Sequence, residues 1–286
     1  MELLYGIITI SFLGGLRLRK AHEVEFQLYG DDMQFVEIML DPGESVVAEA
    51  GAMMYMSEGI VMDTVFGDGS DADAKKGFMD KMLGAGKRVL TGESLFMTMF
   101  TNKAYEKKAV AFAAPYPGKI IAKDLGDLGG QLICQRDSFL CAARGIQIEI
   151  AFQKNIGAGL FGGEGFIMQR LVGDGLAFMH AGGTIIEKEL ASGELLKLDT
   201  GCLVAMTPSV NYNVEFVGDV KSAFFGGEGL FLATLRGPGH VWLQSIPFSR
   251  FASKIYAAAK KSGSSKGKGE SSLLGGIGIG DLFGKD

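Results

Sequence analysis

An internal repeat constrains the fold of this chain more than any local propensity does. A short glycine-glutamate turn leads into a strand-like apolar run three times, in Thr91–Phe100, Gly162–Gln169 and Gly226–Ala233. One structural unit has therefore been used three times, and such a repeat decides the architecture before any single element does. The repeat predicts how the chain is built, but it supplies no reaction.

The similarity extends beyond these turns. Phe35–Ser45 aligns without gaps with Ile185–Leu195, and Lys119–Ile133 is a middle copy with a two-residue insertion and Gln131 in place of the glutamate. Each unit therefore contains two turn motifs. The two motifs are furthest apart in the first copy, so we expect an insertion there.

The expected insertion coincides with a change of composition. Gly67–Ala74 is polar, and the apolar residues after it recur at helical spacing, at Phe78, Met79, Met82 and Leu83. We predict a short inserted helix within about residues 67–87. A surface helix that covers one end of a sheet is preferred to a mobile lid.

The rest of the repeats shows short runs of β-branched and aromatic residues separated by turn signals, which predicts an all-β fold. The 43 glycines agree, because tight turns between short strands often require positive φ. Three large rings, Phe112, Phe178 and Trp242, fall at equivalent points of the units and are interpreted as core anchors. The clearest strand patterns are Val24–Tyr29, Phe35–Leu40, Ile146–Phe152, Asn211–Val217 and His240–Leu243.

The repeat divides the chain into three β units, at residues 22–106, 107–183 and 184–247. An apolar N-terminal extension, 1–21, precedes them. Its run Leu3–Leu13 is shorter than the roughly 20 residues that span a bilayer. No basic residue precedes that run, as a signal peptide would require. A buried strand, or an upstream extension of the true start, is the preferred interpretation.

The segment after Pro247 departs from the β pattern. Apolar residues recur at helical spacing beside a cationic side, which predicts a basic amphipathic helix over 248–262. Docking onto its own domain is the preferred role, and lying on an anionic membrane surface is the alternative. The glycine- and serine-rich tail 263–286 is predicted to be disordered. The pattern comprises Phe248, Phe251, Ile255 and Ala259, with Arg250, Lys254, Lys260 and Lys261.

Composition limits the class of protein. With 286 residues, 47% hydrophobic and 21% charged, the chain can bury a substantial core. Its net charge of −5 and pI near 5.4 disfavour a general nucleic-acid binder, because phosphate neutralisation needs a basic surface. The three cysteines, Cys134, Cys141 and Cys202, form no CxxC pair. We therefore expect no disulfide scaffold and a cytoplasmic location.

Cofactor and metal motifs are weak. Gly157–Gly162 satisfies the GxGxxG pattern, but a further glycine turn and a strand-like run follow it in place of the helix that a dinucleotide site requires. His22, His180 and His240 are widely spaced, and none has a second histidine or cysteine at ligand spacing. We expect no cofactor.

Motifs for nucleophilic catalysis are also missing. The sequence contains no GxSxG elbow, and its cysteines lie within apolar runs, where cysteine is usually a small buried hydrophobe. We therefore expect a chain that is not an enzyme. A hydrolase whose site is assembled by folding is the remaining catalytic hypothesis.

Three repeated glutamates, Glu93, Glu164 and Glu228, are the candidate site residues. They would cluster and bind a metal or a small ligand if the units packed around a pseudo-threefold axis. A structural role is preferred, because a carboxylate in a glycine turn can accept free backbone N–H groups. Glu44 and Glu194 receive the same interpretation, which the loss of the acid in the middle copy supports.

Four segments carry a resemblance to a known family: Pro42–Met56, Leu90–Phe96, Phe225–Phe231 and the glycine-rich tail. Together they resemble the altered-inheritance-of-mitochondria family of uncharacterised proteins in its bacterial or archaeal form, over about residues 22–262. The resemblance implies three repeats of a shortened double-stranded β-helix or β-sandwich unit, similar to the subunit of the tryptophan RNA-binding attenuation protein. It implies no active site, and the similarity to an RNA binder concerns the fold alone.

These observations predict a non-catalytic β-repeat protein that self-associates and acts as a scaffold or interaction module. Its expected partners are further copies of itself and a protein or membrane surface that contacts the C-terminal basic helix. The expected location is cytoplasmic, with a peripheral membrane location as the alternative. The alternative function is binding of a small ligand or metal by the repeated glutamates.

Overall fold

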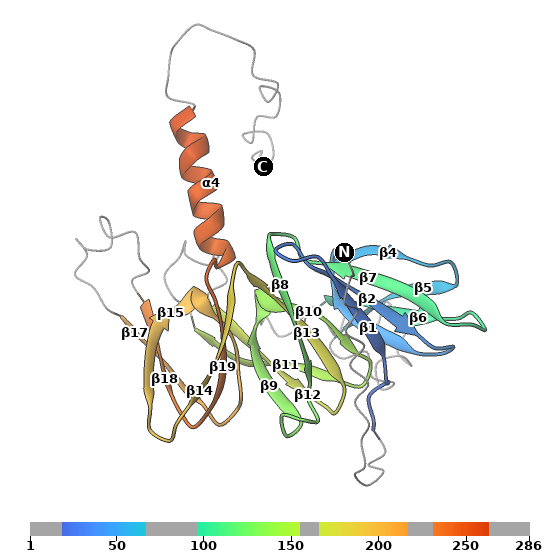
Figure 1. Cartoon of the computed structure of the whole chain (residues 1–286), viewed down its shortest axis with the longest axis horizontal. Coiled ribbons are helices and arrows are strands. Elements are labelled where there is room, and N and C mark those ends of the chain that lie inside the picture. Colours follow the sequence, from blue (N-terminus) through green and yellow to red (C-terminus); the bar gives the residue numbers. More distant parts are fainter. Residues whose placement is uncertain (1–18, 67–95, 155–165, 217–230, 263–286) are drawn as a thin grey trace, which may run out of the picture. The chain divides into compact units, whose positions relative to one another are not determined.

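The computed structural model describes residues 19–66, 96–154, 166–216 and 231–262 (Figure 1). Within these ranges almost every element is a strand, which confirms the predicted all-β class, and one α-helix lies near the C-terminal end. The helix predicted within 67–87 lies outside the described residues, as do residues 1–18 and the tail 263–286.

After a separate first strand, β1 (Glu25–Tyr29), the described strands fall into three units of six. The first unit contains β2 (Phe35–Leu40), β3 (Ser45–Glu49), β4 (Met53–Met56), β5 (Ile60–Phe66), β6 (Phe96–Asn102) and β7 (Lys108–Ala113). The second contains β8 (Gly118–Asp124), β9 (Gln131–Gln135), β10 (Phe139–Ala143), β11 (Gln147–Lys154), β12 (Phe166–Val172) and β13 (Leu176–Gly182). The third contains β14 (Ile185–Leu190), β15 (Leu195–Asp199), β16 (Leu203–Met206), β17 (Asn211–Phe216), β18 (Phe231–Arg236) and β19 (Gly239–Gln244).

Strand pairing follows the same order in each unit. The first, sixth and third strands are neighbours in one sheet, as β2-β7-β4, β8-β13-β10 and β14-β19-β16. The fourth, fifth and second strands are neighbours in the other, as β5-β6-β3, β11-β12-β9 and β17-β18-β15. β1 extends the first of these sheets by pairing with β2. Each unit therefore contributes two small antiparallel sheets.

A strand pair joins each unit to the next. The second strand of one unit pairs antiparallel with the third strand of the following unit, β3 with β10 and β9 with β16. Ala48 lies opposite Cys141 in the first junction, and Cys134 lies opposite Ala205 at the equivalent position of the second. Small sheets from neighbouring units thereby merge into two six-stranded sheets.

The pairing assigns β7 to the first unit, because β7 pairs with β2 and with β4. The first unit therefore extends to Ala113, beyond the boundary that the sequence predicted after residue 106. That boundary was drawn from turn motifs along the chain, whereas the pairing partners of β7 are distant in sequence. The boundary predicted between residues 183 and 184 falls between β13 and β14.

The hydrophobic core runs through the junctions. One buried cluster contains Val36 and Ile38 from the first unit and Cys141 from the second. Another contains Val47 and Leu171, together with alanine and tryptophan side chains of the third unit. Because burial stabilises by about 25 cal/mol per Å² of apolar surface, the junctions contribute to stability as the interior of a unit does.

The three predicted core rings are buried: Phe112 and Phe178 are 0% exposed and Trp242 is 1% exposed. They are not all equivalent, however. Trp242 pairs with Glu187, but the counterpart of Glu187 in the first unit pairs with Ala111 rather than with Phe112. Phe112 is therefore displaced by one residue, and successive side chains of a strand point to opposite faces.

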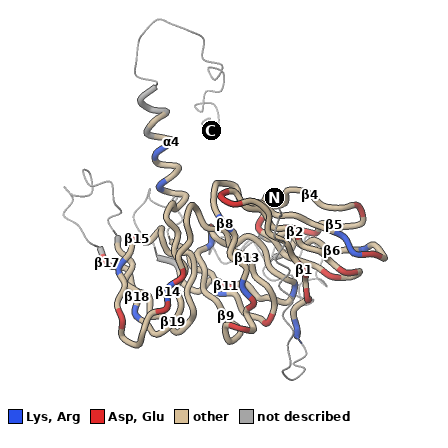
Figure 2. The backbone as a smooth tube through the Cα atoms, viewed as in Figure 1, with Lys and Arg blue, Asp and Glu red and all other residues tan. Residues whose placement is uncertain are grey.

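The helix α4 (Phe248–Ser262) confirms the predicted C-terminal helix. Three of its predicted apolar positions are exposed: Phe248 at 47%, Phe251 at 37% and Ile255 at 55%. At its start, the ring of Phe248 lies 5.0 Å from that of Tyr116. The Lys and Arg positions in the first part of the helix are blue in Figure 2. No helix in the described ranges is both long enough and apolar enough to cross a bilayer.

Candidate functional site

The three candidate glutamates, Glu93, Glu164 and Glu228, lie outside the described residues, and so does the GxGxxG segment at 157–162. In the part of the chain that the structure describes, no group of three or more histidine, cysteine, aspartate or glutamate side chains is arranged to hold a metal. The remaining polar clusters and exposed surfaces of the described residues are therefore the candidate sites.

Glu44 and Glu194 close the turns that lead into β3 and β15. Glu44 Oε2 accepts the backbone N–H of Asp41 at 2.8 Å, and Glu194 Oε2 accepts that of Ala191 at 2.8 Å. The glycine before each glutamate has φ of +87° or +80°, which residues with a Cβ rarely adopt. The predicted structural role is confirmed at these two positions.

The histidines have separate roles in the described residues. His22 Nδ1 accepts the backbone N–H of Ser45 at 2.9 Å and so holds the segment before β1 against β3. His180 is 2% exposed, and burial lowers its pKa to about 4. Its ring packs edge-on against Tyr116, with centroids 4.3 Å apart. His180 is consequently a neutral core residue at physiological pH.

Two of the three cysteines are unsuited to nucleophilic chemistry. Cys134 and Cys141 are 0% exposed, and burial raises the pKa of the Cys134 thiol to about 12. Burial raises the pKa of Cys141 as well. A thiol must ionise to attack, so both act as small buried hydrophobes, as the sequence predicted. Cys202 is half-buried.

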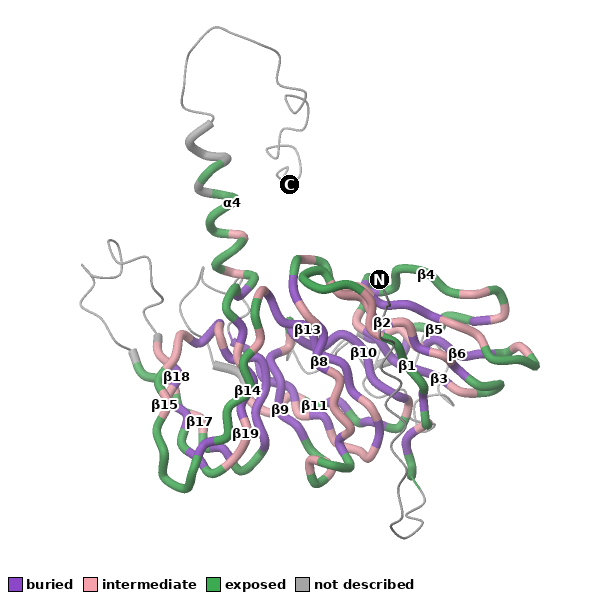
Figure 3. The backbone as a smooth tube through the Cα atoms, in the orientation of Figure 1, coloured by how far each residue is buried: buried purple, intermediate pink, exposed green. Residues whose placement is uncertain are grey.

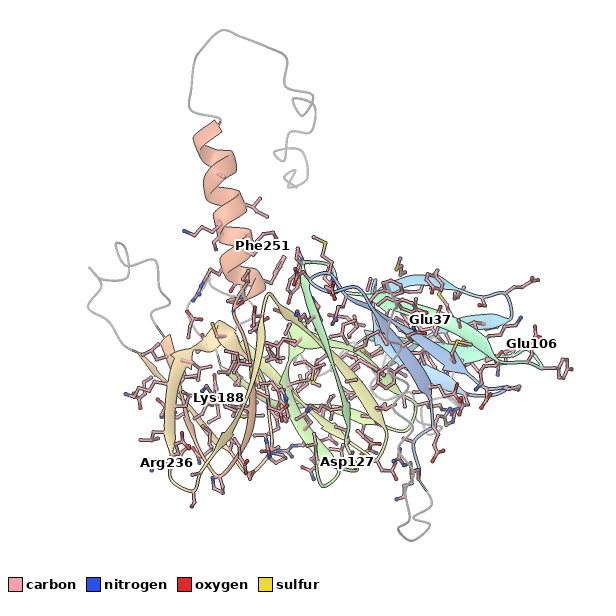
Figure 4. All side chains as sticks on the ribbon, viewed as in Figure 1. Glu37, Glu106, Asp127, Lys188, Arg236 and Phe251 are labelled. Carbon is pink, nitrogen blue, oxygen red and sulfur yellow. The ribbon has the colours of Figure 1, made fainter. Side chains whose placement is uncertain are left out.

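An open hollow of about 520 Å³ lies where the second and third units meet. Its walls come from the turn after β8, the first residue of β9, the turn after β16 and the first residues of β19. Asp127 marks the turn after β8 in Figure 4. The polar lining consists of Asp127, Gln131, Thr207, Ser209 and His240. Hydroxyl groups and an imidazole in one hollow match the composition of a hydrolase site, so their contacts decide its chemistry.

The hydroxyl groups that line the hollow form hydrogen bonds within the protein. Thr207 Oγ1 and Ser209 Oγ lie 3.1 Å apart, and Thr207 Oγ1 accepts the backbone N–H of His240 at 3.0 Å. The imidazole Nδ1 of His240 faces Glu187 Oε1 at 3.5 Å. Hydroxyls and imidazole therefore have different partners, and the hydroxyl-to-base contact of a hydrolase is not formed among these described residues.

Glu187 lies at the centre of a polar cluster that links the second and third units. Its Oε2 accepts the indole N–H of Trp242 at 2.8 Å and the ammonium of Lys123 at 3.0 Å. The Lys123 Nζ also lies 4.8 Å from the centroid of the Trp242 ring. Partial burial opposes ionisation, but these two donors lower the pKa of Glu187. The carboxylate therefore stays charged and acts as a structural link between β8 and β14.

Glu49 is a titratable residue that sequence reasoning missed. It ends β3 at the first junction, and burial raises its pKa to about 7. Asp137 raises the pKa further, whereas Arg136 opposes the increase. A single acid directly after the buried run Val46–Ala48 was the available signal. Its position at the end of β3, beside charged residues of the next unit, suits a structural acid at a junction.

The most distinctive exposed surface is β4, another feature that sequence reasoning missed. All four of its residues are large and apolar, and all are exposed: Met53 36%, Met54 54%, Tyr55 40% and Met56 37% (Figure 3). The corresponding strands of the other units, β10 and β16, are completely buried. The sequence run Met-Met-Tyr-Met was the available signal, since it contains no charge.

Comparison with known proteins identifies relatives of the same fold. The family model described as mitochondrial biogenesis AIM24 matches residues 26–246. An uncharacterised protein of Streptococcus pyogenes serotype M6 is 31% identical over 228 residues, which cover 78% of this chain and 86% of that protein. A crystal structure of a Streptococcus pyogenes protein matches with a TM-score of 0.66 and 25% identity, over 82% of this chain and 100% of that chain.

Proposed function

The chain belongs to the AIM24 family of uncharacterised proteins, and from that premise we propose that it is a non-catalytic, self-associating scaffold that acts through its surfaces. The observation that carries the proposal is the exposure of large apolar side chains on β4 and on α4. Contiguous exposed apolar surface on a soluble protein is typical of interaction sites. The scaffold therefore has two candidate surfaces, a strand edge and a helix.

The polar clusters of the described residues favour a structural role over catalysis. The Glu187 carboxylate joins two units, and the Thr207 and Ser209 hydroxyls belong to a turn. The two buried thiols have raised pKa values. Groups committed in this way are poor nucleophiles or bases, since catalysis requires an activated group within reach of a substrate.

The helix α4 suits an anionic membrane surface or an acidic partner. Phe251, Ile255 and Tyr256 are 37%, 55% and 71% exposed, and the neighbouring Arg250 and Lys254 are exposed as well. Figure 4 shows the Phe251 side chain on the helix. A basic amphipathic helix binds an anionic bilayer by inserting its apolar face, and each Lys or Arg near the surface contributes roughly 1 kcal/mol.

Co-sedimentation with vesicles tests the membrane part of the proposal. The full chain should pellet with vesicles that contain phosphatidylserine and much less with pure phosphatidylcholine, and truncation after Pro247 should abolish pelleting. Ile255→Asp should weaken binding strongly, whereas Ser253→Asp, which changes the net charge equally, should weaken it less. Equal, negligible pelleting of the full and truncated chains would remove the membrane surface from the proposal.

Sedimentation velocity over a concentration series tests the scaffold part. A self-associating chain should show a sedimentation coefficient that increases with concentration. A chain that stays monomeric throughout the series would contradict the scaffold itself. The two experiments are independent, because self-association does not require a membrane.

A further inference from the structure

The first and last units of the described chain each contain one strand that lacks a neighbouring strand. The corresponding strands inside the repeat array have that neighbour. We propose that β15 of one copy pairs antiparallel with β4 of a second copy, so that chains join head to tail as the units join within one chain. The inference rests on the proposed self-association and identifies its interface.

The rule of unit joining leads directly to these two strands. Within the chain, a second strand pairs with the third strand of the next unit, as β3 with β10 and β9 with β16. Among the described residues no unit precedes the first one, which contains β4, and no unit follows the last one, which contains β15. In the described residues β4 pairs only with β7, and β15 pairs only with β18.

Burial distinguishes the end strands from their counterparts inside the array. All residues of β10 and β16 are buried. All residues of β4 are exposed, and this strand is green in Figure 3. Likewise four residues of β3 and four of β9 are buried, whereas no residue of β15 is buried and its Leu195 is 51% exposed. A second copy would cover both end strands in the way that the neighbouring unit covers the internal ones.

The composition of β4 suits an internal strand better than an edge. Natural edge strands are usually protected by charge, proline or a bulge, and terminal repeats usually present a polar face. β4 has a bulge in its pairing with β7, yet it carries no charged residue. β15 carries Lys197, but its ammonium lies 3.4 Å from Glu215 Oε2 on β17 of the same chain. The lysine is thus held by its own unit.

The internal junctions also predict the register of the proposed one. Val47 lies opposite Ala142 and Ile133 lies opposite Met206 at equivalent positions. The same register places Lys197 opposite Met56 of the second copy. One residue further along, Ala48 lies opposite Cys141 and Cys134 lies opposite Ala205. The same register places Leu198 opposite Tyr55 of the second copy.

Other strand edges do not meet the same criterion. The fourth strands β5, β11 and β17 pair only with the fifth strand of their own unit in the described residues. This lack of a second strand partner among the described residues recurs in all three units, so it does not distinguish the ends of the array. Only β4 and β15 lack, among the described strands, a junction that their internal counterparts possess.

The proposed contact is heterologous, since two different edges meet. Such contacts produce a closed ring when the rotation between copies closes, and an open filament when it does not. They also predict complementation: a copy with a blocked β4 still presents β15, and a copy with a blocked β15 still presents β4. A symmetric contact would not behave in this way.

Two charged variants of the full chain block the two edges separately. Met56→Lys places an ammonium opposite Lys197, where like charges destabilise a strand pair. Leu195→Glu places a carboxylate opposite Glu58. The first internal junction predicts this contact, because there the backbone N–H of Arg144 donates to the Ser45 carbonyl at 3.1 Å. Ser45 is the counterpart of Leu195, and Arg144 is the counterpart of Glu58.

Two matched controls carry the same changes on other strands. Met62→Lys changes a methionine of β5 that is 48% exposed, and Ile186→Glu changes an isoleucine of β14 that is 50% exposed. Circular dichroism and urea unfolding verify that each variant folds.

Sedimentation velocity of these variants tests the interface. Each blocked variant should be monomeric or dissociate at least about tenfold more readily, and the two controls should assemble as the original chain does. An equimolar mixture of the two blocked variants should form a complex of two chains and nothing larger.

Three results would overturn the proposal. A monomeric original chain would remove the proposed self-association together with its interface. Association that survives both edge variants would leave the scaffold standing and place its contact elsewhere. Blocked variants that fail to form the two-chain complex when mixed would show that the contact is not head to tail.

Discussion

Replacement of Glu49 by glutamine should make the chain more stable at neutral and alkaline pH. The carboxyl ends β3 at the first junction, where burial raises its pKa from the ordinary 4.5 to about 7, with Asp137 adding to the increase and Arg136 opposing it. Glutamine keeps the size and the hydrogen-bonding capacity of the side chain but cannot ionise. The change therefore removes the cost of burying the charge.

The magnitude follows from the interval between the two pKa values. Below pH 4.5 the carboxyl is protonated in the folded and the unfolded chain, so the original chain has its full stability there. Between pH 4.5 and about 7 the unfolded chain releases the proton first, and stability falls as pH rises. Each pH unit is worth about 1.36 kcal/mol, which sets an upper limit of about 3 kcal/mol, and partial solvation of this half-buried group reduces it.

Urea unfolding monitored by fluorescence measures this difference, because Trp242 is buried and is the only tryptophan of the chain. The Glu49→Gln and original chains should have nearly equal free energies of unfolding at about pH 4, and the variant should be more stable at about pH 8. Glu189→Gln on the exposed face of β14 is the control and should stay within about 0.5 kcal/mol of the original chain. A Glu49→Gln difference that is the same at both pH values would refute the reasoning.

Three further predictions concern individual contacts, each measured by urea unfolding at pH 7. Glu194→Ala removes the acceptor of the Ala191 N–H and should cost about 1 kcal/mol; an unchanged midpoint would mean that the turn does not depend on the carboxylate. Glu187→Ala leaves the indole N–H of Trp242 without its acceptor and should cost about 1–3 kcal/mol, with a change in tryptophan emission; unchanged emission would contradict that contact. A Cβ at Gly118 would overlap the Ala181 carbonyl oxygen, so Gly118→Ala should destabilise by more than about 2 kcal/mol. Gly43→Ala meets open space at φ +87° and should cost only about 1 kcal/mol; equal losses would show that steric overlap is not the cause at Gly118.

Local patterns were sufficient to locate many of the strands. Phe35–Ser45 and Ile185–Leu195, aligned from sequence, contain the first strands β2 and β14 and the turns that follow them. The roles of Glu44 and Glu194 were also predictable, because a carboxylate and a glycine that close a turn act within a few residues of each other. Interactions of short range leave a recognisable signature in the sequence.

Pairing between distant strands was less predictable. The predicted boundary after residue 106 excluded β7 from the first unit. Phe112 was predicted to be equivalent to Trp242, but it lies one residue away from that position in the strand. A slip of one residue in strand register moves every side chain to the opposite face of the sheet. No local sequence pattern distinguishes the two registers here. Glu49 was missed for a similar reason, since its pKa depends on burial at the junction and on Asp137 and Arg136 of the next unit.

The sequence by itself determined the repeated unit: its all-β character, its turns and the apolar residues available for a core. Only the tertiary structure decided which of those apolar residues are covered. β4 and β16 are both apolar third strands, yet β16 is buried between β9 and β19 while β4 is exposed. The difference has a simple physical cause, because the burial of a strand depends on the neighbour that pairs with it and not on its own residues.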